Sequence, residues 1–112
     1  MTTLLPKDAD NNPIPALRLK SGGAHKISAT GTSARNASAF HADTKVVGVY
    51  ADGPVYIALG GASVTASNTG HFLPADLYYD LAVSGGMNGA QATHIAVLAA
   101  GANCTVYISE KE

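Results

Sequence analysis

Apolar and polar side chains alternate with a period of two over most of the chain. Leu17 and Leu19 alternate with basic residues, and the alternation resumes after the glycine pair at 22–23. In the last segment, Cys104, Val106 and Ile108 are predicted to face inward while the residues between them face outward. Because successive side chains of a β-strand point to opposite faces, this pattern predicts strands with one buried face.

Further strands are predicted in the middle of the chain. Residues 45–51 form a β-branched run that predicts a strand covered on both sides. Alternation resumes at 55–59 after Asp52-Gly53-Pro54, so 45–59 is predicted to form a β-hairpin. Residues 79–83 and 94–99 predict two more strands, separated by a glycine-rich segment, 84–92, that is expected to be flexible.

The predicted fold is all-β, in a single domain of residues 16–112. No window of ten or more residues has the 3.6-residue apolar spacing of an amphipathic helix. About eight short strands separated by Gly and Pro turns predict an antiparallel β-sandwich or a jelly-roll-like barrel. The expected core consists of seven side chains: Val47, Val49, Ile57, Leu81, Val97, Val106 and Ile108.

Residues 1–15 differ from the rest and are predicted to form an extended N-terminal arm. They hold three of the five prolines and a turn-forming run at 8–12. The arm has too few apolar residues for a core of its own, but Leu4, Leu5 and Ile14 are candidate assembly contacts on a neighbouring molecule. The competing interpretation is a frayed terminus that contributes nothing.

The charge pattern excludes some partners. Only 13% of the residues are charged, where about 25% is usual, and the net charge is −1 without a basic cluster. We therefore expect no nucleic-acid partner, and a surface suited to permanent assembly. No apolar run is long enough to span a membrane, and residues 1–8 lack the basic and long apolar regions of a signal peptide, so no signal peptide and no membrane association are expected. A single cysteine rules out an internal disulfide.

Candidate catalytic and cofactor residues are present but lack the spacing that such chemistry requires. The four histidines are far apart, and His25 is predicted to be a hydrogen-bonded structural imidazole on an apolar face. Cys104 is predicted to be a buried hydrophobe. Ser63, Ser67 and Ser84 sit in turns without a nucleophile elbow. Asp43, Asp52, Asp76 and Asp80 are expected to be solvated. We therefore predict no enzymatic activity and no metal or other cofactor.

Short apolar motifs recur along the second half of the chain, at residues 55–60, 72–76, 79–83, 94–98 and 105–110, and opening strands of a similar kind lie at 27–34 and 46–49. In these segments the chain resembles small β-sandwich virion proteins of tailed bacteriophages and gene transfer agents. The resemblance covers roughly residues 24–110 as a pattern of short apolar motifs. The chain departs from the family at Asp76, where glycine is usual, and at the insertion-like segment 84–92.

The resemblance implies a structural component of a phage or phage-like particle, such as a head decoration, a head spike base or a fibre-attachment protein. The implied partners are other copies of the chain, as a homo-oligomer, and another virion protein such as the major capsid protein or a fibre. The implied location is the virion, after synthesis in the bacterial cytoplasm. The alternative is a free carbohydrate- or ligand-binding β-sandwich acting in host adsorption, although five Tyr, two Phe and no Trp are few for a sugar-stacking surface.

Overall fold

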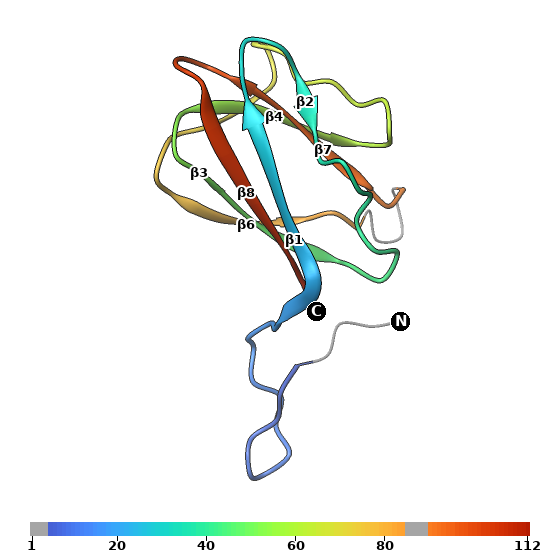
Figure 1. The fold of residues 1–112 in the computed structure, drawn as a ribbon. Coiled ribbons are helices and arrows are strands. Elements are labelled where there is room, and N and C mark those ends of the chain that lie inside the picture. Colours follow the sequence, from blue (N-terminus) through green and yellow to red (C-terminus); the bar gives the residue numbers. More distant parts are fainter. Residues whose placement is uncertain (1–4, 85–89) are drawn as a thin grey trace.

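Two antiparallel four-stranded sheets pack face to face in the computed structural model, which describes residues 5–84 and 90–112 (Figure 1). Within these ranges there is no helix, and hence none long and apolar enough to cross a membrane. The strands are β1 (Leu19–Ala29), β2 (Ala34–Arg35), β3 (Val46–Ala51), β4 (Val55–Gly60), β5 (His71–Leu73), β6 (Tyr78–Ala82), β7 (His94–Ala99) and β8 (Cys104–Lys111).

One sheet has the strand order β1-β8-β3-β6, and the other has the order β2-β7-β4-β5. Every pairing between named strands is antiparallel. The last strand, β8, is central to the first sheet, so the alternating segment at the C-terminus lies between β1 and β3. This architecture confirms the predicted all-β sandwich.

The core lies between the inner faces of the two sheets, where the period-two pattern placed it. Six of the seven predicted core residues are buried: Val47, Val49, Ile57, Val97, Val106 and Ile108. The seventh, Leu81, is only half-buried, because β6 is an edge strand of its sheet. Cys104 is also half-buried, at the margin of the core cluster.

The hairpin predicted for residues 45–59 is wrong, because β3 and β4 belong to different sheets. Asp52 continues the pairing of β3 with β8: its N–H donates to the carbonyl of Thr105 (3.1 Å), and its Oδ1 accepts the N–H of Thr105 (2.7 Å). The chain then crosses to the other sheet at Gly53, where a Cβ would lie 2.7 Å from that of Cys104. A crossing between sheets and a hairpin have the same inward–outward alternation, so local pattern does not distinguish them.

The strand predicted for 45–51 is covered less completely on its outer face than on its inner one. Val47, Val49 and Ala51 are buried inside, whereas Val46 and Tyr50 on the outer face are half-buried. Gly48 is buried from outside by the Tyr78 side chain, whose hydroxyl would collide with a Cβ at that position. Of the predicted flexible segment 84–92, residues 85–89 lie outside the described residues.

Candidate assembly surfaces and the buried polar cluster

The arm turns back on itself instead of being extended throughout. Oδ1 of Asp8 accepts the backbone N–H groups of Asp10 and Asn12, both at 2.9 Å. Asn11 has a φ of 66°, a left-handed conformation that asparagine tolerates better than most residues. The N–H of Ile14 then donates to the carbonyl of Pro6 (2.7 Å) and closes the loop. The hydrogen bonds, led by that from the Asn12 backbone, lower the pKa of the Asp8 carboxyl.

The looped arm stands away from the sandwich. Every residue from 5 to 16 is exposed, and Figure 1 shows this part of the chain projecting beyond one end of the two sheets. Two candidate contacts lie on it: Leu5 is 37% exposed and Ile14 is 41% exposed. The third, Leu4, lies outside the described residues. At the base of the arm, Arg18 and Glu112 exchange two backbone hydrogen bonds of 2.9 Å, which tie the arm to the end of the chain.

A buried carboxylate links three segments at the arm end of the sandwich. Glu110 of β8 is 4% exposed. Its Oε1 accepts hydrogen bonds from the Thr44 hydroxyl (2.5 Å) and from the His41 backbone N–H (2.8 Å), and its Oε2 lies 2.8 Å from Nε2 of His25. The backbone of β1 comes so close that a Cβ at Gly23 would lie 2.8 Å from the Glu110 Cβ. The cluster therefore connects β1, β8 and the loop before β3.

The cluster is fully hydrogen-bonded, and it holds Glu110 ionised. Burial alone would raise the pKa of Glu110, but the hydrogen bonds from Thr44, His25 and the His41 N–H outweigh burial and lower this pKa below its usual value of 4.5. The His25 ring packs edge-on against Phe40, with 5.1 Å between ring centroids. His25 is thus the hydrogen-bonded structural histidine that the sequence predicted, although its carboxylate partner was not foreseen.

The remaining histidines are dispersed over the fold. Nδ1 of His41 accepts the N–H of Asp43 (3.1 Å), Nδ1 of His94 lies 2.8 Å from the Thr93 hydroxyl, and His71 is exposed on β5. In residues 5–84 and 90–112, no group of three or more His, Cys, Asp or Glu side chains could hold a metal ion.

The other candidate catalytic groups serve local structure. Asp52 and Asp76 accept hydrogen bonds from Thr105 and Tyr50, while Asp80 forms an ion pair with Lys111. The Ser67 hydroxyl pairs with that of Thr69 within its own turn. Burial, followed by the nearby Asp52 charge, raises the pKa of the Cys104 thiol and so disfavours a reactive thiolate. These contacts bring together no nucleophile, base and orienting group.

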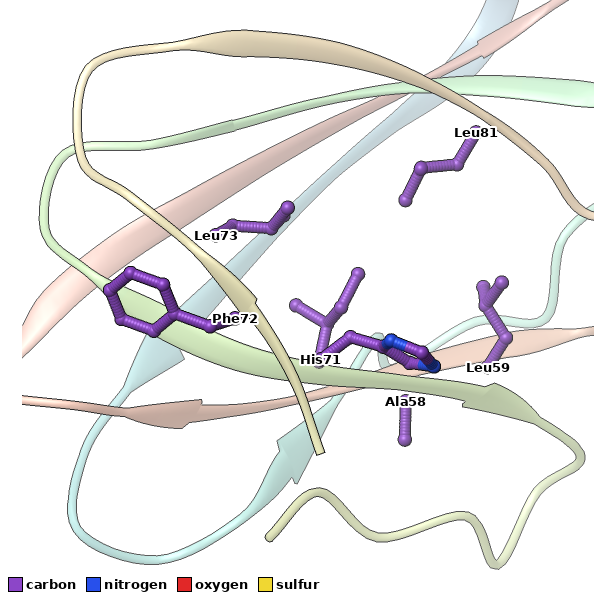
Figure 2. A pocket seen from close by; sticks show the side chains of 7 residues that line it. Ala58, Leu59, His71, Phe72, Leu73 and Leu81 are labelled. Atoms are coloured by element: carbon purple, nitrogen blue, oxygen red, sulfur yellow. The ribbon is translucent and has the colours of Figure 1, made fainter. Parts of the chain in front are cut away.

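An apolar hollow opens between the two sheets at the edge formed by β5 and β6. It has a volume of about 540 Å³, and Figure 2 shows Leu59 and Leu81 meeting it from opposite sheets. Its lining residues are Ile57, Ala58, Leu59, His71, Phe72, Leu73 and Leu81. With His71 as the single titratable group in the lining, the hollow offers apolar contact and little to hydrogen-bond a sugar.

An aromatic row crosses the outer face of the β1-β8-β3-β6 sheet. The strand register places Lys26, Tyr107, Tyr50 and Tyr78 side by side, one on each strand. The Tyr50 and Tyr107 rings lie 6.3 Å apart between centroids, and the Lys26 ammonium lies 5.7 Å from the Tyr107 centroid. Sequence reasoning missed this row because its three tyrosines come from distant segments. Each of the three tyrosines occupies an outward-facing position on its own strand, but only the register between the strands places the three side by side.

Three further charged side chains border this row. Lys111 pairs with Asp80 at 2.6 Å and lies 4.8 Å from the Tyr78 ring centroid. The hydrogen bond with Asp80 is the main reason why the pKa of Lys111 is raised. Asp76 accepts the Tyr50 hydroxyl hydrogen bond (3.0 Å), which raises the pKa of that phenol. The face thus combines three aromatic rings with charges of both signs.

Comparison with known proteins found no matching family model, no matching curated protein and no matching solved structure. The resemblance to virion proteins accordingly rests on the sequence motifs alone.

Proposed function

We propose that this chain is a non-enzymatic structural component of a phage or phage-like particle, which decorates the head or attaches a spike or fibre through protein–protein contacts. The observation that supports this proposal is the looped arm, which projects from the sandwich with all its described residues exposed. A terminal segment that contributed nothing would not need the six hydrogen bonds that involve Asp8, Asn12 or Ile14. The proposal otherwise rests on the sequence resemblance.

In this proposal, the arm anchors the subunit on a neighbouring protein. Leu5 and Ile14 present exposed apolar surface where the Ile14–Pro6 hydrogen bond closes the loop. Complete burial of such a side chain contributes about 1.5–3 kcal/mol, so a few of them would hold a subunit against a larger particle. The turn reduces the ordering cost of binding, because part of the arm already has a defined conformation.

Deletion of residues 2–15 tests the anchor. Particles produced without this chain are mixed with the full chain or with the truncated chain, and bound protein is measured after sedimentation. We expect the truncated chain to fold, as judged by circular dichroism, and to lose particle binding. A double variant, Leu5→Ser with Ile14→Ser, should lose most of the binding, whereas Asp10→Ser in the same arm should not. Full binding by the truncated chain would contradict the anchor.

The alternative function, free carbohydrate or ligand binding, has less support from the geometry. The hollow between the sheets is lined mainly by apolar groups and lacks the convergent hydrogen-bonding groups that orient a sugar. A glycan array with the full chain would separate the two functions, since the structural proposal expects no glycan signal.

A further inference from the structure

We propose that the outer face of the β1-β8-β3-β6 sheet is a self-docking surface, on which a second copy of this chain stacks about a two-fold axis that runs along the strands. The proposal extends the proposed assembly role to a second contact, one that is separate from the arm. It rests on the row Lys26, Tyr107, Tyr50 and Tyr78 and on the charges that border it.

The order of side chains in the row is complementary to itself. A two-fold axis along the strands, between β8 and β3, places β1 over β6 of the second copy and β8 over its β3. Tyr107 then meets Tyr50 of the second copy, and Lys26 meets Tyr78. The interface contains each of these contacts twice, because the same patch serves on both copies.

Charge complementarity favours this axis over a two-fold axis that runs across the strands. Lys26 stands at the β1 edge of the row, and Asp80, whose side chain is 59% exposed, stands at the β6 edge. The proposed axis brings Lys26 near Asp80 of the second copy, where a carboxylate already paired with Lys111 has lone pairs for another donor. An axis across the strands would instead lay β1 over β1 and β6 over β6, which opposes like charges.

The aromatic side chains are exposed in the way that an interface core requires. Tyr78 is 53% exposed and Tyr107 is 44% exposed, and tyrosine is enriched in the buried centres of protein interfaces. Three strand spacings of about 4.8 Å with flanking side chains, over the length of about 26 Å spanned by the eight residues of β8, give a face of roughly 500 Å² per copy. The area buried on both copies together is at the low end for specific interfaces. The dimer is therefore expected to be weak in solution and to be favoured where a particle concentrates its subunits.

Sedimentation equilibrium of the full chain over a range of concentrations tests the proposal. We expect a monomer–dimer equilibrium in which Tyr107→Ala weakens association about tenfold or more. The matched control is Tyr56→Ala, which removes a tyrosine from β4, an interior strand of the other sheet. Lys26→Glu and Asp80→Lys should each weaken the dimer, and the double variant should restore it. Circular dichroism verifies that each variant is folded.

Three results would overturn the self-docking surface: a wild-type chain that stays monomeric at all concentrations, equal effects of Tyr107→Ala and Tyr56→Ala, or no restoration by the double charge reversal. Binding of a glycan that Tyr107→Ala abolishes would assign the row to carbohydrate and would also overturn it. Failure of the self-docking proposal would not contradict the proposed anchoring by the arm, because particle binding after deletion of residues 2–15 is a separate measurement.

Discussion

Replacement of Glu110 is the most informative perturbation of the fold, because one carboxylate connects three segments. Its two oxygens face Thr44, the His41 N–H and His25, and none of the buried side-chain polar atoms in the described residues lacks a partner. Glu110→Ala leaves those donors without their acceptor in a site where the Glu110 and His25 side chains are almost fully buried. Each buried donor left without an acceptor costs about 1–3 kcal/mol, so the three together cost several kcal/mol, a large fraction of the stability of a small domain.

Glu110→Gln separates the charge from the hydrogen bonds. The Gln oxygen can accept from Thr44 and His41, and its amide can donate to a neutral His25 ring, so we expect a loss of only about 1 kcal/mol at neutral pH. The folded pKa of Glu110 is lowered from 4.5, so its ionised form stabilises the fold above about that pH. That contribution is lost as the pH falls through the folded pKa. The difference between wild type and Glu110→Gln should therefore shrink in acid.

The assay is urea unfolding followed by far-ultraviolet circular dichroism, at neutral pH and at several acidic pH values. Glu112→Gln is the matched control: its partner Arg18 is 2.8 Å away but exposed, so we expect a change below about 0.5 kcal/mol. A loss below about 1 kcal/mol for Glu110→Ala, or a Glu110→Gln difference that does not change with pH, would refute the structural role of this cluster.

Two further predictions concern packing and backbone conformation. Ile108→Ala on the central strand β8 should cost about 2–5 kcal/mol in urea unfolding, because Ile108 is 1% exposed; a loss below about 0.5 kcal/mol would contradict its place in the core. Asp76 has a φ of 65°, so Asp76→Gly should change stability little despite the lost Tyr50 hydrogen bond, whereas Asp76→Val should cost about 1–2 kcal/mol more. Equal thermal unfolding midpoints for the two Asp76 variants would contradict the left-handed conformation.

Local sequence was sufficient for the longer strands and for most of their buried faces, although Leu19, which the alternation placed in a strand with one buried face, is 67% exposed. The alternation at 104–109 predicted which side chains of β8 point inward, because the geometry of a single strand decides this. The same reasoning placed His25 and Ile27 on the inner face of β1. Asp76, in contrast, has a φ of 65°, in the left-handed region that glycine adopts freely, and no alternation pattern predicts such a backbone conformation.

Short strands and sheet membership required the tertiary structure. β2 and β5 have only two and three residues, too few for alternation to be recognised. The predicted end of β3 at Asp52-Gly53-Pro54 is correct, but β4 belongs to the other sheet instead of forming a hairpin with β3. The alternation along the chain is the same for a hairpin and for a crossing between sheets. The choice depends on which partners the strands find, β8 for β3 and β7 for β4, and these partners lie far along the chain.

The Glu110 cluster and the tyrosine row were both decided by tertiary structure, for the same reason. The sequence alone determined an all-β domain, an arm with exposed apolar residues, and residues without catalytic spacing. It could not determine that Glu110 meets His25 and Thr44, or that Tyr50, Tyr78 and Tyr107 form one row. A strand's own pattern sets which face each side chain occupies, but contacts across strands depend on long-range register, which single-segment periodicity does not contain.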